Sequence, residues 1–519
     1  MQADLPLIEP SAARPNQSAF AEDGLPGVIA ALLAEMRALY QEDSVPWVVG
    51  YSGGKDSTAT LQLVWMALRG IDPAKRTKPV HVISTDTLVE NPIVASWVAR
   101  SLEVMGDVAG AESLPLSPHR LTPDIRDTFW VNLIGRGYPA PRPKFRWCTE
   151  RLKINPSNAF IRRVVRDHGE AVLILGIRKS ESQARARAMD RAESGRVRDR
   201  LSPNASLPNS LVYSPIEAWT NDDVWLFLMQ HENAWGYDNK ALLTMYQGAS
   251  SDGECPLVVD TSTPSCGDSR FGCWTCTLVD RDKSMQAMIQ NDDEKEWMLP
   301  LLQLRDALDV TDDRHLRDFR RMDGSVQLFH DRPIHGPYTQ AARESWLRRV
   351  LETQLLVADA APAGVGAIQL ISLPELVEIR RIWVVDKHEF EDRVPRIYEE
   401  VLGQPFPEPV IDEHLQLGAD ELELLAEIVD DPLHYQLVRE LLDIERRYKG
   451  SGRRHGLFDD MTRAFRRGFY SDADDATERA RTRRDLLAAG TEAEVPGLTP
   501  RDHADGWIQL REQAETDAA

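Results

Sequence analysis

The sequence predicts an α/β protein with a doubly wound parallel sheet, and three observations lead to that fold class. Apolar runs of strand length occur at 47–51, 79–84 and 172–178. Segments with helical periodicity separate them, which is the alternation typical of parallel sheets. Each run also ends in polar residues. In open sheets of this type ligands bind at the carboxyl ends of the strands, so we expect one crevice there.

The elements follow in order along the chain. Residues 1–25, rich in Pro, Ala and polar groups, are expected to be loose. From Thr58 to Arg69 the residues Leu61, Val64 and Leu68 recur on one helical face. Helices are predicted at 28–40, 58–69, 91–105 and 221–231. The turn-rich stretch 192–211 is expected to form a loop over the site.

The length of 519 residues exceeds what one hydrophobic core usually supports, so several domains are expected. After an irregular stretch at 250–279, a helical pattern runs from 280 to 356, and residues 357–366 are the best linker candidate. We predict a flexible N-terminus, a nucleotide-binding domain that contains the Cys-rich stretch, a helical region, an α-helical C-terminal extension and a charged tail. Their predicted ranges are 1–25, 26–290, 291–356, 367–460 and 461–519.

Composition excludes some classes of protein. The hydrophobic fraction of 42% and the charged fraction of 28% are those of a soluble globular protein. No apolar run approaches the roughly 20 residues of a membrane span. The N-terminus has no basic region followed by an apolar core, so no secretory signal is predicted. We therefore expect a cytoplasmic protein without a membrane partner.

Charge is distributed unevenly. The formal net charge is −21, which argues against a protein that coats nucleic acid. From Arg142 to Arg200, however, 16 Lys and Arg residues face 7 Asp and Glu residues. This basic island is either a site for phosphate-rich ligands or an ordinary solvated surface.

The segment Ser52-Gly53-Gly54-Lys55-Asp56-Ser57 is the strongest local signal. It joins the first strand to a helix through a glycine turn, and backbone N–H groups at such a helix N-terminus bind anions. The spacing is not that of a Walker A loop. It resembles the pyrophosphate loop of ATP pyrophosphatases, which cleave ATP between the α- and β-phosphates. The alternative is a structural glycine turn.

The resemblance implies a role for each residue of the loop, which begins at Ser52. Lys55 neutralises the pyrophosphate, and Gly53 and Gly54 let backbone N–H groups approach it. Ser57 donates its hydroxyl and caps the helix, while Asp56 helps to hold Mg²⁺.

A second polar cluster, Asp86 with Thr87, follows the second strand, and both residues are candidates for the ATP site. Asp86 either meets the ribose or adenine of ATP or serves as the N-cap of the following helix.

Further motifs occur in one order along the chain: STDT with ENP at 84–92, RWCT with Arg151, Lys153 and Pro156, GIR at 176–178 with Glu181 and Arg185, and DVW at 223–225. Over about residues 45–280 this order resembles the phosphoadenosine phosphosulfate (PAPS) reductase superfamily. The resemblance implies that Gly176 and Arg178 belong to the ATP site. It also places Arg151, Lys153 and Arg185 at the crevice, facing phosphates.

The five cysteines are Cys148, Cys255, Cys266, Cys273 and Cys276. Four thiolates bind either zinc or an iron–sulfur cluster. The superfamily resemblance favours a 4Fe–4S cluster on Cys148, Cys266, Cys273 and Cys276, with a structural zinc as the alternative. Cys255 is then another ligand, a buried small residue or a sulfur-carrying thiol.

The cysteines also indicate the type of reaction. True PAPS reductases use a nucleophilic Cys near the C-terminus, and no Cys follows Cys276 here. The Cys255–Cys276 stretch and the GSGRRHGL segment at 450–457 resemble the DndC-like sulfurtransferases of DNA phosphorothioation. That resemblance implies ATP pyrophosphatase activity, DNA as acceptor, a cysteine desulfurase as sulfur donor, and other subunits of the modification system. The basic island and Arg446–Arg454 are the candidate DNA contacts, and such phosphate contacts carry no sequence information.

The expected reaction begins with attack of a DNA phosphoryl oxygen on the α-phosphate of ATP, and sulfide or a persulfide then displaces AMP. Three other functions fit parts of the sequence. A tRNA thiolation enzyme pairs the same loop with cysteine clusters, but no RNA-binding module is evident. A non-catalytic nucleotide-sensing iron–sulfur subunit of a DNA modification or defence complex needs only the binding features. A PAPS reductase lacks its C-terminal Cys.

Overall fold

The computed structural model describes residues 17–196, 198–204, 206–249, 271–362, 368–408, 419–449, 454–468 and 470–488. The chain divides into two compact units whose segments alternate along the sequence. Unit 1 comprises Met1–Val131, Ala140–Val310 and Arg349–Glu375, and unit 2 comprises Asn132–Pro139, Thr311–Arg348 and Leu376–Ala519. Neither unit is a single stretch of sequence, whereas the predicted domains are consecutive.

Unit 1 is built on a six-stranded sheet in the order β3-β2-β1-β4-β6-β5, and the predicted doubly wound fold class is confirmed. Neighbouring strands are parallel except for β5, which pairs with β6 in the antiparallel sense. The strands are β1 Trp47–Gly50, β2 Val80–Thr85, β3 Leu116–Leu121, β4 Ala171–Ile174, β5 Ser202–Pro203 and β6 Ser210–Tyr213. The chain crosses from one side of β1 to the other, so β1 and β4 flank the topological switch point.

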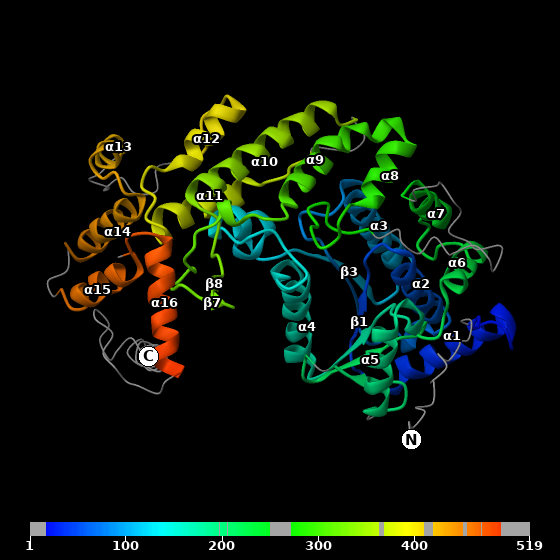
Figure 1. Cartoon of the computed structure of the whole chain (residues 1–519). Helices are drawn as coiled ribbons and strands as arrows, with labels where there is room; N and C mark the ends of the chain where they lie inside the picture. The colour runs from blue at the N-terminus through cyan, green and yellow to red at the C-terminus, as the bar shows by residue number, and fades with distance from the viewer. Residues whose placement is uncertain are drawn as a thin grey trace, which may run out of the picture. The chain divides into compact units, whose positions relative to one another are not determined.

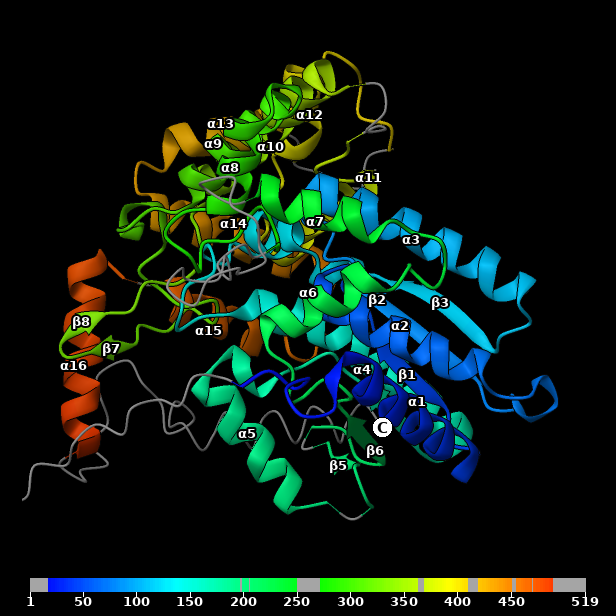
Figure 2. The ribbon, with the colours of Figure 1, turned by 90° about the vertical axis from the view of Figure 1, so that its right-hand side faces the viewer.

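Alternate residues of β1 enter two hydrophobic cores on opposite faces of the sheet. Trp47 and Val49 pack with side chains of α1, α2, α3 and α6, whereas Val48 packs with α4. Figures 1 and 2 show α1 and α2 side by side along one face of the sheet. These helices are α1 Gly24–Glu42, α2 Lys55–Arg69, α3 Pro92–Ala111, α4 Asn155–His168 and α6 Asn221–Gln230. The double layer fixes the first turn of α2 at the carboxyl end of β1.

Several local predictions for unit 1 need correction. Residues 192–211 are not one loop, because α5 (Gln183–Ser194) enters this stretch and β5 and the start of β6 lie within it. The helical pattern of 280–356 is broken between α9, which ends at Leu308, and α10, which begins at Gln340. α10 (Gln340–Ala360) also continues into the predicted linker at 357–366. The other helices of the unit are α7 Asn239–Gly248, α8 Lys283–Asn291 and α9 Leu299–Leu308.

Unit 2 is largely helical, as expected for the C-terminal extension (Figure 1). Leu437 and Ile444 of α14 pack against Leu457 and Ala464 of α15 in a small separate core. The elements are α11 Leu373–Arg381, α12 Arg393–Leu402, α13 Ala419–Ile428, α14 Pro432–Lys449, α15 Leu457–Gly468, α16 Ala473–Ala488, and the short strands β7 Leu328–Phe329 and β8 Arg332–Pro333. Among the described helices of both units, none combines the length and the apolar character needed to cross a bilayer.

Candidate functional site

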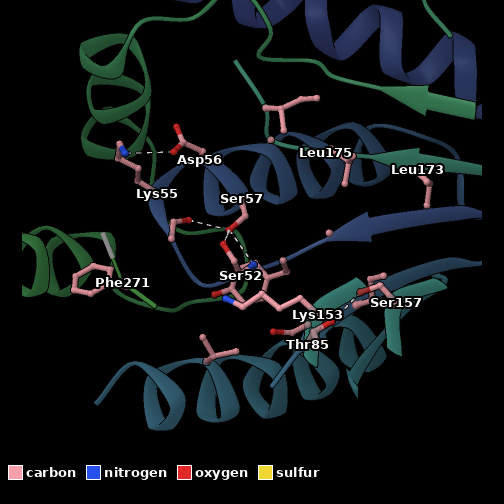
Figure 3. Close-up of a pocket in the computed structure, with 18 of the residues that line it drawn as sticks. Ser52, Lys55, Asp56, Ser57, Thr85, Lys153, Ser157, Leu173, Leu175 and Phe271 are labelled. Carbon is pink, nitrogen blue, oxygen red and sulfur yellow. Dashed lines mark hydrogen bonds and ion pairs between the residues drawn. The ribbon is translucent and has the colours of Figure 1, made fainter. Parts of the chain in front are cut away.

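A cleft of about 1120 Å³ lies at the carboxyl ends of β1, β2 and β4. Residues 52 and 54–57 line it from the loop after β1, Thr85 and Asp86 from the end of β2, and residues 175–178 from the loop after β4. Figure 3 shows Ser52, Lys55 and Ser57 around the start of α2, with Lys153 and Thr85 across the cleft. The predicted crevice is therefore present at the predicted edge of the sheet.

The glycine turn of the loop is required by its geometry. Gly53 has φ +75°, and a Cβ there would lie 2.3 Å from Cγ2 of Val98. Gly54 is the N-cap residue of α2 and makes no side-chain capping hydrogen bond. The Lys55 N–H donates to the hydroxyl of Tyr246 at 3.3 Å. The loop thus presents a helix N-terminus, which favours negative charge, to the cleft.

Ser57 does not cap the helix, so that part of its predicted role is wrong. It lies in the first turn of α2, where its hydroxyl donates to the carbonyl of Gly54 at 3.0 Å. Its Oγ also accepts a hydrogen bond from the backbone N–H of Ser52 at 3.1 Å. These two bonds close the loop on itself and hold Ser52 toward the cleft.

Asp56 lies between two cations. Its Oδ1 accepts a hydrogen bond from Nε of Arg178 at 2.7 Å, and its Oδ2 lies 3.3 Å from Nζ of Lys55. Arg178 is 5% exposed and also donates to Ser180 at 2.9 Å, so it is a fixed part of the cleft wall. The structure therefore brings the predicted residues Lys55, Asp56 and Arg178 into one charge cluster.

Gly176 lets the loop after β4 approach α2. A Cβ at this position would lie 2.6 Å from the backbone oxygen of Asp56. Because a backbone atom cannot give way as a side chain can, only glycine fits here. Gly176 thus sets the distance between Arg178 and Asp56.

Asp86 accepts a hydrogen bond from the Leu88 N–H at 2.8 Å and from Nε of Arg120 at 3.0 Å. The N-cap residue of α3 is Asn91, whose side chain accepts from the Ile93 N–H. The alternative role of Asp86 as the cap of that helix is therefore wrong. Asp86 and Arg120 both line the cleft and form an ion pair at its rim.

The three predicted cations at the crevice lie in different places. Lys153 and Arg185 line the cleft, and Arg185 forms an ion pair with Glu181 at 2.9 Å. Arg151 is not among the lining residues and forms an ion pair with Asp127 at 2.7 Å. The prediction of Arg151 as a cleft residue is therefore wrong. Arg151 and Lys153 are two positions apart in the π-helical turn Thr149–Ile154, so their side chains leave the turn on different sides.

The segment that carries Cys273 is hydrogen-bonded to the loop after β2. The Asn91 N–H donates to the carbonyl of Gly272 at 3.2 Å, and the Trp274 N–H donates to the carbonyl of Val89 at 2.9 Å. Trp274 is 2% exposed and packs against Trp130. This pairing places Cys273 beside the loop that follows the cleft residue Asp86.

The surroundings of Cys273 are polar and lie close to the cleft. Its Sγ lies 3.3 Å from Oγ1 of Thr87 and 3.9 Å from Oε1 of Glu90. Burial, with the nearby Glu90 carboxylate, raises the pKa of the Cys273 thiol to about 12. Lys153 lies 3.6 Å from Glu90, and Cys273 together with Glu90 raises the pKa of this lysine against the effect of burial. Lys153 therefore connects the cleft with the cysteine segment.

The described thiols have the chemistry of a soft-metal site. Cys148, Cys273 and Cys276 are free and partly buried. Burial raises the pKa of Cys148, and the thiol of Cys276 adds to the shift. Cys276 also adds to the raised pKa of Cys273, so the three side chains lie within electrostatic reach.

The described residues contain no group of three or more His, Cys, Asp or Glu side chains placed to hold a metal ion. Cys255 and Cys266, which were predicted as possible ligands, lie outside the described residues.

Sequence reasoning assigned no role to several residues of the site. Tyr246 holds the start of α2 by its hydrogen bond to Lys55, and its helix α7 carries no motif. Ser157 accompanies Thr85 at the cleft, with their hydroxyl oxygens 2.9 Å apart. Glu90 belongs to the ENP motif within residues 84–92. Its acidic side chain among the basic residues of the family motifs was the signal that could have indicated a role in the site.

Most cations of the basic island have carboxylate partners. Ion pairs are formed by Arg151, Lys153, Arg166, Arg178, Lys179, Arg185, Arg196, Arg198 and Arg200. In the second candidate segment, Arg446 and Arg447 both pair with Asp443. A DNA phosphate at either place would have to compete with these carboxylates.

Comparison with known proteins agrees with the superfamily resemblance. Residues 46–278 match the family model of the phosphoadenosine phosphosulfate reductase domain. An uncharacterized protein of Methanocaldococcus jannaschii is 27% identical over 193 residues, which are 37% of this chain and 33% of that protein. The chain thus matches about a third of that relative's length.

Several solved structures are also similar, among them the following two. A PAPS reductase from Candida auris in a phosphate complex has 16% identity and a TM-score of 0.26, over 44% of this chain and 93% of that chain. An FMN adenylyltransferase from Candida glabrata with FAD and inorganic pyrophosphate has 13% identity and a TM-score of 0.25, over 47% and 68%. Residues 46–278, a little under half of the chain, are therefore similar to the PAPS reductase domain.

Proposed function

We propose that this chain, with its PAPS reductase domain, is an ATP-dependent sulfurtransferase that cleaves ATP to AMP and pyrophosphate and inserts sulfur into the DNA backbone. One observation carries the proposal. The segment of Cys273 is hydrogen-bonded to residues 89–91, directly after the cleft residue Asp86, and Lys153 borders both places. The cleft and the thiol segment therefore border one another, which supports a reaction that couples ATP cleavage to sulfur chemistry.

The loop residues would hold the phosphates of ATP. The N-terminus of α2 faces the cleft, and Lys55 would leave Asp56 to neutralise the β- and γ-phosphates. Arg178 would keep Asp56 in place, and the oxygen freed by Lys55 would be available to Mg²⁺. Positioning and charge neutralisation supply most of the catalysis in such reactions.

The proposed chemistry has two displacements. A non-bridging oxygen of a DNA phosphodiester attacks the α-phosphorus of ATP, a P–O bond forms, and pyrophosphate leaves with Mg²⁺. Sulfide then attacks the DNA phosphorus, a P–S bond forms, and the P–O bond to AMP breaks. The sulfide comes from the persulfide of a cysteine desulfurase, with a thiol as the two-electron reductant of the S–S bond.

The proposal includes a 4Fe–4S cluster, a group that four thiolates can bind, and Cys148, Cys266, Cys273 and Cys276 would hold it. When bound, it would supply electron transfer or a place for sulfur. The residues of this chain that would border it are Thr87, Glu90 and Lys153, because they surround Cys273. The lysine would offset the negative charge of the thiolates, and Thr87 would donate a hydrogen bond to sulfur.

The test compares two variants with the wild type in one anaerobic assay of AMP, pyrophosphate and DNA sulfur. Lys55→Ala should lower AMP release by about 10²–10³-fold, because a charge that acts on the leaving phosphates is lost. Its iron content and visible absorbance should stay unchanged. Lys75→Ala, at an exposed lysine of the same unit, is the matched control and should behave as wild type.

Cys273→Ser should lose iron, sulfur incorporation and AMP release, because AMP leaves only in the second displacement, while the pyrophosphate of the first displacement should still form once per DNA site. If pyrophosphate production persists in Lys55→Ala, the assignment of the loop is wrong. A zinc-loaded, iron-free wild-type protein would contradict the cluster. If sulfur were incorporated into tRNA and not into DNA, the chain would be a tRNA thiolation enzyme.

A further inference from the structure

Unit 2 contains a second cavity, of about 390 Å³, that the proposed function does not use. Its walls come from Arg136, residues 318–324 and 337–339, the start of α10, residues 382–389 after α11, α14 and the end of α15. Seven Lys and Arg side chains line it, against four Asp and Glu side chains. In a chain with a net charge of −21, this concentration of positive charge is unusual.

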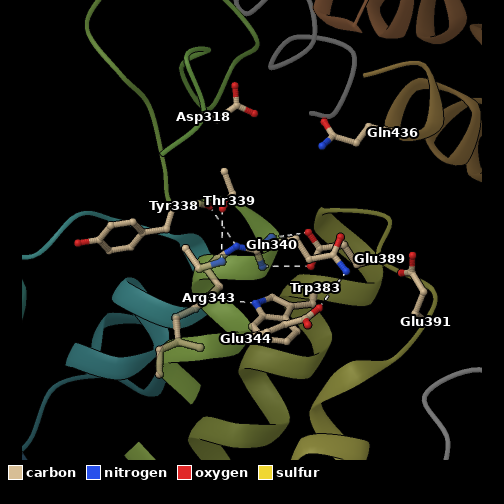
Figure 4. A network of polar contacts seen from close by, with 12 residues as sticks. Asp318, Tyr338, Thr339, Gln340, Arg343, Glu344, Trp383, Glu389, Glu391 and Gln436 are labelled. Atoms are coloured by element: carbon tan, nitrogen blue, oxygen red, sulfur yellow. Dashed lines mark hydrogen bonds and ion pairs between the residues drawn. The ribbon is translucent and has the colours of Figure 1, made fainter. Parts of the chain in front are cut away.

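The carboxylates of the cavity are already neutralised. Asp318 pairs with Arg320 at 2.7 Å, and Glu389 pairs with Arg343 at 3.1 Å. Figure 4 shows Arg343 beside Glu389 and Trp383. The other two, Glu440 and Asp386, pair with Arg467 and Arg381. These pairs leave no carboxylate of the lining without a guanidinium.

Three cations of the lining have no such partner. Among the described residues, Arg136, Arg321 and Lys387 form no hydrogen bond or ion pair through their side chains. The Nε atom of Arg136 is buried and lacks an acceptor. A buried donor without a partner costs free energy, so an anion that supplied the acceptor would be favoured.

The backbone holds the two inner cations in place. Arg136 is the last residue of the π-helical turn Val131–Arg136, and Lys387 follows the π-helical turn Ile382–Asp386. π-Helical turns are rare in proteins, and those that occur are often found at functional sites. After Arg136, Gly137 has φ +82°, and its carbonyl accepts from the Tyr338 N–H at 2.6 Å. A Cβ at Gly137 would lie 3.0 Å from the Tyr338 oxygen, so this position is closely packed.

We infer that Arg136, Arg321 and Lys387 form a binding site for a phosphomonoester dianion, carried by a small molecule no larger than a mononucleotide. Three unpaired cations require more negative charge than one carboxylate brings, and guanidinium and ammonium groups match phosphate oxygens. The volume is at the lower end of the range for small-molecule pockets. The site lies entirely within unit 2 and stands whether or not the ATP cleft has the proposed function.

Lys387 supplies a direct readout. Burial, with the neighbouring Arg343 charge, lowers the pKa of Lys387 to about 8, although Glu389, Asp318 and Asp386 oppose the shift. At pH 8 a substantial fraction of this amine is neutral and reacts with acylating reagents. A bound phosphate dianion would favour the charged form and cover the amine, and both effects slow acylation.

The experiment measures acylation of Lys387 in the full chain by peptide mass spectrometry, with inorganic phosphate, AMP or acetate added. Phosphate and AMP should protect Lys387 and move its pH profile of labelling to higher pH, whereas acetate should do neither. Protection by AMP at lower concentration than by phosphate would identify the ester as the ligand, and equal protection would identify the free anion. Exposed Lys75 is the internal control and should not be protected.

Variants separate this site from the ATP cleft. Arg136→Gln should weaken protection at Lys387 at least about tenfold, the loss expected for one charge-assisted hydrogen bond. Arg396→Gln, at an exposed arginine of unit 2 outside the cavity, is the matched control. Lys55→Ala should leave the protection unchanged. Absence of protection in the wild type at tens of millimolar phosphate, or equal protection by acetate, would overturn the inference.

Discussion

Asp56 shows how single residues of the cleft are prepared for a ligand. One of its oxygens is held by the buried Arg178, and the other lies near the partly exposed Lys55. Only Lys55 can leave without breaking the wall of the cleft, because Arg178 is also bonded to Ser180. The same carboxylate therefore fixes the wall and holds Lys55 at the proposed phosphate-binding loop.

A first prediction concerns Gly53. Gly53→Ala forces a left-handed residue to carry a Cβ 2.3 Å from Cγ2 of Val98, so either the loop or the Val98 side chain must shift. We expect the free energy of unfolding to fall by about 1–3 kcal/mol, as for other overpacked sites, and the affinity for ATP to fall with it. Gly110→Ala, near the end of α3 with nothing within 4 Å of the added carbon, should be neutral or stabilising. Equal loss in both variants, measured by chemical denaturation, would contradict the steric account.

At this scale the sequence predicted the loop well, because the residues of a short motif are placed by local geometry. Its failures are also local. Ser57 is three residues inside the helix and not at the cap, which only the boundary of α2 reveals. Arg151 and Lys153 differ in what they face because a π-helical turn carries both. Tyr246 reaches the loop from 191 residues away, and no pattern around it indicates that contact.

Two neighbouring strands carry a partly buried histidine pair. Nδ1 of His81 on β2 lies 3.1 Å from Nε2 of His119 on β3, and both rings contact Phe160 of α4. Burial lowers the pKa of both histidines, with nearby positive charge from His119, His168 and Arg163 acting on His81 and from Arg163 acting on His119. The pair is thus kept neutral within the sheet.

This pair predicts a pH dependence of stability. The folded state resists protonation, so the unfolded state binds more protons below the ordinary histidine pKa of about 6.5. The contribution is present above that pH and is lost as the pH falls through the lowered values. His81→Gln/His119→Gln should therefore flatten the decline of unfolding free energy between about pH 7 and 5. His455→Gln, at an exposed histidine, should leave this decline unchanged. An unchanged slope in the double variant would show that the histidine pair does not cause the pH dependence.

The elements themselves were predicted unevenly, and the reason is hydrophobic patterning. The central strands β1, β2 and β4 are apolar runs, because both faces of the sheet are covered. β3 is an edge strand that contains Pro118 and alternates with polar residues, so it carries no such run. β6 is four residues long and is embedded in a turn-rich stretch. Short strands of this kind are fixed by pairing with neighbours that are distant in sequence.

For the whole molecule, the alternation of two compact units was beyond sequence reasoning. Unit 2 takes Asn132–Pro139 from the middle of the segment that the PAPS reductase model covers. No change of composition marks those eight residues, because their membership depends on contacts with residues far along the chain. The five consecutive domains predicted from the sequence therefore do not coincide with the two compact units, and their independent folding stays a prediction.

Global charge leads to a prediction about DNA. The net charge is −21, and the cations of the basic island are largely ion-paired. We expect the isolated chain to bind duplex DNA only at the non-specific level, with Kd on the order of 10⁻⁴–10⁻⁶ M at physiological salt. Partner subunits should tighten it. Fluorescence anisotropy over a salt series checks this, and nanomolar binding by the isolated chain would contradict it.

The central claim is that AMP release and sulfur insertion are two halves of one reaction. The most direct measurement supplies α-labelled ATP and a desulfurase with sulfur-labelled cysteine under anaerobic conditions, and counts AMP and DNA phosphorothioate together. The account predicts equal yields of the two products, and no AMP above background when DNA is omitted. Sulfur incorporation without AMP, or AMP formation that is indifferent to DNA and to the sulfur donor, would contradict it.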